Sequence, residues 1–203
     1  MLTGIFQTII MLLALSTFYA TDFWMLKKYN RFRPPETVKK DWGYIIMTPV
    51  VVGLFPLQPV FLPSLGLYPA AWWGLVVQIL GVVMIIAGSI INYCSRIHLA
   101  QYYDRYGGVL PDHQVVESGP YAYVRHPIYS SYYLIVAGLV LVNPSAVTLV
   151  MLIFICFDFT HHARRDEKAL CESLPGYADY MQRTPRFVPR LGKGRAPGRG
   201  DKG

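Results

Sequence analysis

Residues 71–94 read AWWGLVVQILGVVMIIAGSIINYC, an apolar run without a charged residue. A helix that crosses a bilayer needs roughly 20 such residues. Across the 203 residues of the chain, 53% are hydrophobic and 15% are charged, whereas about 25% are charged in ordinary soluble domains. The apolar residues also occur in blocks. The sequence therefore predicts an all-α integral membrane protein.

Other apolar segments bring the expected number of transmembrane helices to about five. Residues 2–26 form a long apolar run that one aspartate interrupts. Residues 42–62 carry several prolines and predict a kinked or broken span. Residues 128–142 and 145–157 are both short, and Asn143-Pro144 between them is a turn signal. These last two segments predict a tight helical hairpin in the bilayer.

Basic residues fall on alternate connections between these segments. All 19 Lys and Arg lie in residues 27–40, 96–125 and 164–202. Because basic loops stay on the cytoplasmic side, the N-terminus is expected outside and the C-terminus in the cytosol, in a bacterial inner membrane or the endoplasmic reticulum. The net charge of +7 then reflects orientation and attraction to membrane lipids, and no nucleic-acid partner is expected. A cleaved signal peptide over residues 1–20 is disfavoured because a basic n-region is missing.

The chain is expected to have three parts. These are transmembrane helices over 1–94, a catalytic region over 95–190 with the helical hairpin at 128–160, and a disordered, Gly-rich basic tail over 191–203. In the first part, Gly74, Gly81 and Gly88 recur every seven residues. Small residues on one face allow close approach of helices, so this spacing predicts a packing seam.

Two polar segments flank the predicted hairpin. The first, residues 113–129, reads HQVVESGPYAYVRHPIY. Proline is tolerated at the first position of a helix, so Pro127 is expected to begin one, with His126 near its N-cap. Exposed N–H groups at such a helix start suit an anion or a carboxylate.

The second polar segment, residues 158–189, reads DFTHHARRDEKALCESLPGYADYMQRTPRFVP. Its Asp166 and Glu167 can hold a cation or a polar ligand. From the pattern alone, the simpler interpretation is a solvated helix end in which both acids pair with Arg164, Arg165 and Lys168. Adjacent histidines on a helix point apart, so His161, His162 and His113 do not predict a metal site.

These motifs together resemble the isoprenylcysteine carboxyl methyltransferase family, which itself resembles the membrane phospholipid N-methyltransferases. The matching stretches are VVESGPYAYVRHPIY at 115–129, DEKAL at 166–170, LPGYADY at 174–180 and TPRFVP at 184–189. Long motifs in the right order around a hairpin are a specific signal. The resemblance implies an integral membrane enzyme that uses S-adenosyl-L-methionine (SAM) without a Rossmann domain. It also implies a lipophilic acceptor that enters from the bilayer.

The resemblance assigns roles to individual residues. The catalytic residues would be Arg125, His126 and Glu167. The cofactor-binding residues would be His113, Gln114, Val115, Val116, Tyr121, His126, Pro127, Ile128, Tyr129, Asp166 and Glu167. The substrate-binding residues would be His162 and Arg165. Asp166 stands where the family has a glutamate, and His162 where it has a substrate-facing arginine, which favours an acceptor other than a carboxylate.

Three other functions stay open at this point. An amine or phospholipid acceptor would have to lose a proton, which His126, His162 or Glu167 can take. Membrane sterol reductases have a related C-terminal half and bind a nicotinamide cofactor, although they usually have more spans. A membrane protein without enzymatic activity would leave the polar motifs unexplained.

Overall fold

The structure, a computed structural model, describes residues 3–29, 55–63, 66, 73–103, 109 and 112–190. Its helices are α1 (Ile5–Lys28), α3 (Phe55–Phe61), α4 (Trp73–Leu99), α5 (Pro127–Val142), α6 (Ala146–Ser173) and α7 (Tyr177–Arg183), with short 3₁₀ helices η4 (Ala100–Tyr102) and η5 (Gly119–Ala122). Within the described ranges the structure contains no strand beyond an isolated bridge between Gly66 and Ser145. The all-α prediction is confirmed.

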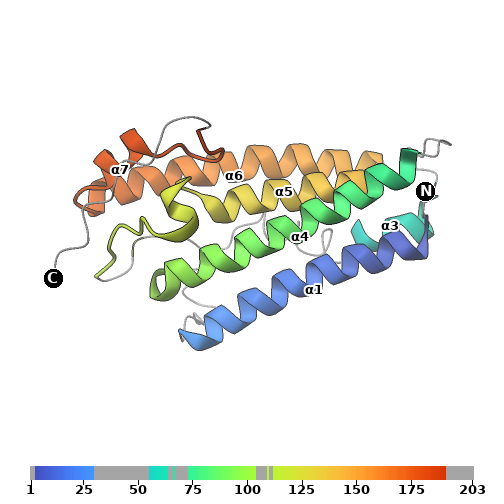
Figure 1. The fold of residues 1–203 in the computed structure, drawn as a ribbon, viewed down its shortest axis with the longest axis horizontal. Helices are drawn as coiled ribbons and strands as arrows, with labels where there is room; N and C mark the ends of the chain where they lie inside the picture. Colours follow the sequence, from blue (N-terminus) through green and yellow to red (C-terminus); the bar gives the residue numbers. More distant parts are fainter. Residues whose placement is uncertain are drawn as a thin grey trace.

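Among the described residues, three helices are long and apolar enough to cross a membrane, namely α1, α4 with η4, and α6. Together with the shorter apolar α5 they run along the long axis of the molecule (Figure 1). The protein is therefore an integral membrane protein. Most of the predicted kinked span over 42–62 lies outside the described residues. Its last part forms α3, a seven-residue helix beside the N-terminal end of α1.

The predicted hairpin is present, and its second arm continues into the polar segment. Pro127 begins α5 and His126 is its N-cap, as predicted. After the turn, Ser145 and Thr148 form a capping box that starts α6. This helix continues to Ser173, beyond the hairpin bound at residue 160, because the polar segment after residue 158 prolongs it as a helix. The three-part division of the chain, including the tail over 191–203, remains a prediction, and that tail lies outside the described residues.

Glycines allow α4 and α5 to approach closely. A Cβ atom on Gly81 would lie 2.6 Å from the carbonyl oxygen of Gly138, and one on Gly138 would lie 2.6 Å from that of Gly81. A Cβ atom on Gly88 would meet Ile135 at 2.6 Å. The predicted packing seam is confirmed for Gly81 and Gly88.

Buried polar side chains fix the hairpin turn at one end of the molecule. Gln7 of α1 and Gln78 of α4 each donate from Nε2 to the carbonyl of Val142, at 2.9 Å. Asn143 donates to Gln58 of α3 at 2.7 Å. Polar groups that lack partners are costly in lipid, so these bonds define where the turn docks.

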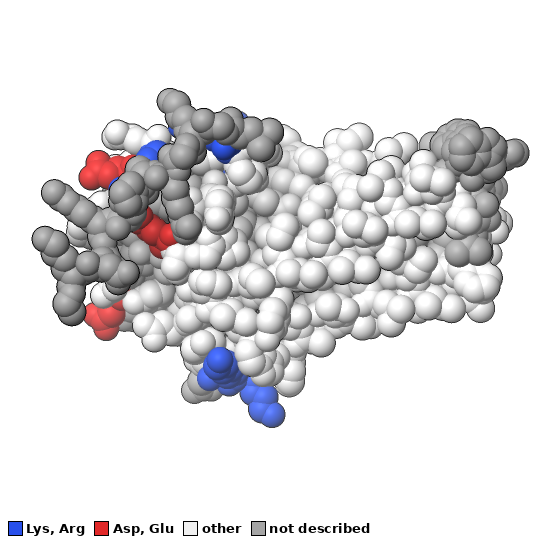
Figure 2. Space-filling model, viewed as in Figure 1, with Lys and Arg blue, Asp and Glu red and all other residues white. Residues whose placement is uncertain are grey.

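Charged residues gather at the opposite end (Figure 2). The described segments 3–21, 55–63, 73–95 and 126–157 contain no Lys, Arg, Asp or Glu. The charged end therefore holds the C-terminal parts of α1, α4 and α6 and the start of α5 (Figure 1). This polarity agrees with the expected orientation, which itself remains a prediction.

Candidate functional site

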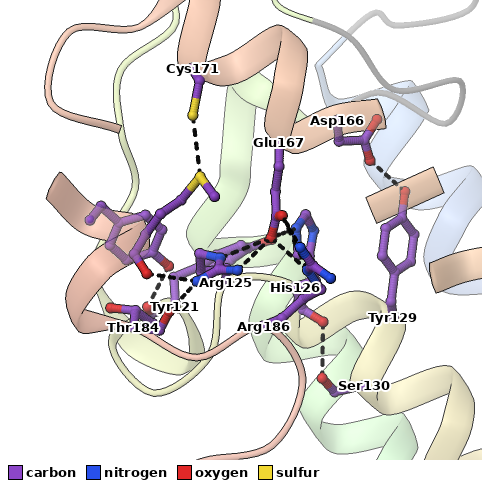
Figure 3. Close-up of polar contacts among 12 residues, drawn as sticks. Tyr121, Arg125, His126, Tyr129, Ser130, Asp166, Glu167, Cys171, Thr184 and Arg186 are labelled. Carbon is purple, nitrogen blue, oxygen red and sulfur yellow. Dashed lines mark hydrogen bonds and ion pairs between the residues drawn. The ribbon is translucent and has the colours of Figure 1, made fainter. Parts of the chain in front are cut away.

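A buried carboxylate lies where the start of α5 meets the C-terminal part of α6 (Figure 3). Glu167 accepts from Arg125, whose Nη2 lies 2.8 Å from Oε1, and from Arg186, whose Nη2 lies 2.5 Å from Oε2. The Nε2 atom of His126 lies 3.1 Å from Oε1. We call these four residues the Glu167 cluster. They come from three parts of the chain that are distant in sequence.

The Arg125 guanidinium also ties the cluster to the segment that follows α7. Its Nη1 donates to the carbonyls of Met181, at 2.8 Å, and Thr184. The backbone N–H of Arg125 donates to Pro185 at 2.8 Å, and that of His126 donates to Arg186 at 3.1 Å. We call residues 184–187 the C-terminal strap. The strap therefore lies along residues 125–126. This contact joins the motif at 115–129 to the motif at 184–189.

The cluster carries more positive than negative charge. Two guanidiniums share the carboxylate of Glu167, whose side chain is 5% exposed. The Arg125 side chain is 9% exposed and that of Arg186 is 32% exposed. The hydrogen bond to Glu167 raises the pKa of Arg186 above its ordinary value, so this residue stays charged. The excess positive charge suits an anionic group at the accessible side of Arg186.

Asp166, the neighbour of Glu167, has a different environment. The hydroxyl of Tyr129 donates to its Oδ2 at 2.8 Å. The Tyr129 ring lies in a stack between His126, at a centroid distance of 5.5 Å, and Phe159, at 5.1 Å, with planes 13° and 7° apart. Asp166 is half-buried and belongs to no ion pair among the described residues.

Further aromatic rings extend this stack along α5 and α6. Tyr132 lies 4.9 Å from Phe159, and Tyr133 lies 5.1 Å from Phe187 of the C-terminal strap. We call the resulting set the aromatic wall. It consists of Tyr129, Tyr132, Tyr133, Phe159 and Phe187. It places an apolar surface beside the Glu167 cluster.

The predicted cofactor segment 113–116 lies outside the helices and is held by aromatic and apolar contacts. The His113 ring stacks on Tyr102 at 4.5 Å, and burial lowers its pKa. Val115 packs against α7, while Gln114 is exposed and Val116 is half-buried. Tyr121 is buried, and its carbonyl accepts from Tyr180 at 2.7 Å. Residues 113–121 are therefore fixed against α7.

The structure brings some of the predicted site residues together and separates others. Arg125, His126 and Glu167 meet directly, and Tyr129 reaches Asp166. The pairing of Glu167 with Arg164, Arg165 and Lys168 is wrong, because the side chain of Glu167 turns into the bundle, where it is buried, while those three basic residues are exposed.

The two predicted substrate residues lie outside the cluster. His162 lies 3.6 Å from Asp158 on the same helix, and Arg165 is exposed. Their role stays a prediction. Pro127 and Ile128 form the first residues of α5, and Ile128 packs against Met25, Leu26 and Tyr103.

The sequence interpretation missed Arg186. Its signal was the arginine inside the TPRFVP motif at 184–189, which was recognised as a motif but not assigned a role. Arg186 binds the Glu167 carboxylate through both Nε and Nη2. This contact could not be inferred from spacing, because α7 sets the path by which the strap returns.

Comparison with known proteins bears on this arrangement. Residues 80–172 match the model of the isoprenylcysteine carboxyl methyltransferase (ICMT) family. The resemblance to the ICMT family is confirmed. The ICMT match includes most of α4, all of α5 and nearly all of α6, with Arg125, His126 and Glu167.

Two curated relatives match part of the chain. The cobalt-zinc-cadmium resistance protein CzcN of Cupriavidus metallidurans is 37% identical over 78 residues, 38% of this chain and 36% of the relative. The nickel-cobalt-cadmium resistance protein NccN of Alcaligenes xylosoxydans xylosoxydans is 34% identical over 80 residues, 38% of this chain and 37% of the relative. The alignments therefore span well under half of either relative, whose names refer to metal resistance.

Proposed function

We propose that the protein is a SAM-dependent methyltransferase that acts on a lipophilic acceptor reaching it from the bilayer. The observation that carries this proposal is the contact of Arg125 and His126 with Glu167 inside the ICMT-matched segment. This contact lies at the charged end of an apolar bundle, where a polar cofactor and an apolar acceptor can meet.

The residues at the site fit the chemical groups of SAM. Asp166 is an acidic group outside the ion pairs of the Glu167 cluster, so we assign it the amino group of the cofactor. Aromatic rings attract a sulfonium, and the aromatic wall supplies such rings beside Asp166. The backbone of 113–116 is assigned the adenine edge. When bound, SAM supplies an activated methyl group.

The chain itself contributes positioning and exclusion of water. The aromatic wall would hold the apolar part of the acceptor, and the C-terminal strap would cover the polar part from solvent. Holding two reactants in alignment can supply several kcal/mol of a reaction barrier, on the order of 7–11 kcal/mol in the best cases. Proximity is therefore expected to dominate the rate enhancement.

The charge of the Glu167 cluster favours a carboxylate acceptor of the isoprenylcysteine kind. A carboxylate is ionised at neutral pH and needs no general base, and the excess positive charge of Arg125 and Arg186 would attract it. This argument outweighs the presence of His162 where the family has an arginine. An amine or phospholipid acceptor remains the alternative, with His126 or His162 as the base.

Binding of S-adenosylhomocysteine and SAM to the detergent-solubilised protein, measured by calorimetry, tests the proposal. We expect wild type to bind, Asp166→Asn to bind at least about tenfold more weakly, and Arg183→Gln, on an exposed ion pair with Glu117, to bind like wild type. Absence of binding by folded wild type would overturn the proposal, and oxidation of a reduced nicotinamide would instead support a reductase. Transfer of labelled methyl groups to isoprenyl-thioether acids or to lipid amines then identifies the acceptor class.

A further inference from the structure

A buried ion pair joins α1 to α4 beneath the aromatic wall. The Nη1 atom of Arg96 lies 2.9 Å from Oδ1 of Asp22, and the two side chains are 0% and 4% exposed. The hydroxyl of Tyr103 also donates to Asp22. The Arg96 guanidinium lies 4.9 Å from the centroid of the Tyr103 ring and 5.1 Å from that of Phe18. The pair is therefore enclosed by protein on all sides.

Such a pair needs a reason beyond stability. Buried ion pairs contribute little or nothing compared with well-packed apolar residues of similar size. Ionisable residues between apolar helices are also expensive, and they commonly mark functional sites. Since apolar residues would join α1 to α4 at least as well, Asp22 and Arg96 must provide something that apolar packing does not. A guanidinium differs from an apolar group in its fixed, planar fork of donors.

That fork reaches the aromatic wall. The Nη2 atom of Arg96 donates to the hydroxyl of Tyr132 on α5 at 3.1 Å. The Tyr132 ring lies 4.9 Å from Phe159 and 6.3 Å from Tyr129. Tyr129 in turn donates to Asp166. A continuous set of contacts therefore runs from the ion pair to the acidic residue of the candidate site.

We propose that Asp22 and Arg96 are positioning residues for the site. Asp22 fixes the Arg96 guanidinium, Arg96 fixes the hydroxyl of Tyr132, and the Tyr132 ring sets the orientation of Tyr129 and Phe159. Helix α1, outside the segment matched by the family model, thereby becomes part of the site. In its consequence for catalysis this inference rests on the proposed function, whereas the orientation of Tyr129 can be measured without it.

The first test reads out the orientation of Tyr129 directly. Fluorotyrosine is placed at position 129 in the full chain and its ¹⁹F signal is compared in wild type, Asp22→Asn, Tyr132→Phe and the control Gln78→Met. Gln78 is also a buried hydrogen-bonding residue, but its side chain donates to Val142 at the far end of the bundle. We expect the signal to shift or split in the first two variants and to match wild type in the control.

Melting temperatures measured in parallel separate positioning from loss of fold. Tyr132→Phe removes one hydroxyl and keeps the ring, so it is expected to fold even if Asp22→Asn does not. An unchanged signal at position 129 in folded Tyr132→Phe would overturn the proposal. A shift of similar size in Gln78→Met would also overturn it, because the effect would then reflect general loosening.

The second test measures affinity for S-adenosylhomocysteine. We expect Asp22→Asn and Tyr132→Phe each to weaken binding about fivefold, and the double variant to be no weaker than Asp22→Asn alone, because both act through one set of contacts. Fully additive losses would contradict the proposal. If wild type fails to bind, the proposed function fails, while the fluorine comparison still decides whether the ion pair positions Tyr129.

Discussion

At the scale of single residues, the site is organised by arginine geometry. Arg125 uses Nε and Nη2 for Glu167 and Nη1 for the carbonyls of Met181 and Thr184, so one side chain joins α6, α7 and the C-terminal strap. Lysine carries the same charge on a single nitrogen and cannot reproduce this fork. The requirement at this position is therefore for shape as much as for charge.

Replacing Arg125 by lysine tests this requirement. We expect Arg125→Lys to lower the free energy of unfolding by about 2–3 kcal/mol, because buried acceptors lose their donors. The matched control Arg183→Lys alters an exposed ion pair with Glu117, which is worth about 0–1 kcal/mol. Unfolding of both variants in detergent is the measurement, and equal losses would contradict the assigned role.

The lowered pKa of His113 predicts a pH dependence of stability. Burial favours the neutral ring, so the folded state resists the proton that the unfolded chain takes up below the ordinary value of 6.5. The contribution of His113 is therefore complete above that value and is lost as the pH falls from it through the lower pKa of the folded state.

The ring-preserving variant His113→Phe is expected to remove this part of the pH dependence. Melting temperatures at about pH 7.5 and about pH 5.5 should then differ less in His113→Phe than in wild type. His161→Phe, on an exposed position of α6, serves as the control. A pH dependence that persists in full in His113→Phe would show that other groups cause it.

At the scale of elements, contact between α4 and α5 decides where the site sits. The approach at Gly81 and Gly138 leaves no room for a side chain, as the 2.6 Å distances show. Because His126 is the N-cap of α5, any displacement of α5 along this seam also moves the Glu167 cluster. Helix packing and site geometry are thus linked through one glycine pair.

The variant Gly138→Ala tests this link. We expect overpacking to cost about 1–3 kcal/mol and to reduce affinity for S-adenosylhomocysteine, although residue 138 is far from the cluster in sequence. Val83→Ala, at a position of α4 that is 55% exposed, is the control for a volume change on the lipid side. A destabilised Gly138→Ala with unchanged affinity would show that the seam and the site are independent.

Much of the position and length of the helices could be predicted from the sequence. Uncharged runs predicted α1 and α4 closely, and Pro127 and Asn143-Pro144 marked the bounds of α5, because prolines and turn residues have strong local preferences. The extension of α4 to Leu99 was not predicted. It includes Arg96, which pairs with Asp22 of α1, and spacing along the chain does not reveal contacts between distant residues.

The same distinction holds for the site. Arg125, His126 and Glu167 were identified through motifs, and the structure brings them together. Arg186 was missed because its role depends on how the strap returns after α7. The interpretation of Glu167 as a solvated residue failed because the pattern of α6 does not show that α5 and the strap cover this face.

At the scale of the whole molecule, the charged side chains of the described residues gather toward one end of an apolar bundle (Figure 2). We expect this end to face the cytosol. A fluorescent protein fused to the C-terminus should therefore fluoresce. Alkaline phosphatase fused after Gly66 should be active, because this enzyme works outside the cytosol and Gly66 is expected to lie there. The opposite pair of results would reverse the orientation.

The return of the chain through α5 and α6 also shapes how the protein is made. The residues from 126 to 157 carry no formally charged side chain, so the hairpin can enter the lipid as one unit during translation. Arg125 and Glu167 then stay on the side where they were synthesised, and neither has to cross the hydrocarbon, which would cost a single arginine at least about 2.5 kcal/mol. The two halves of the site are thus delivered to the same compartment, and they can meet as soon as the strap leaves the ribosome.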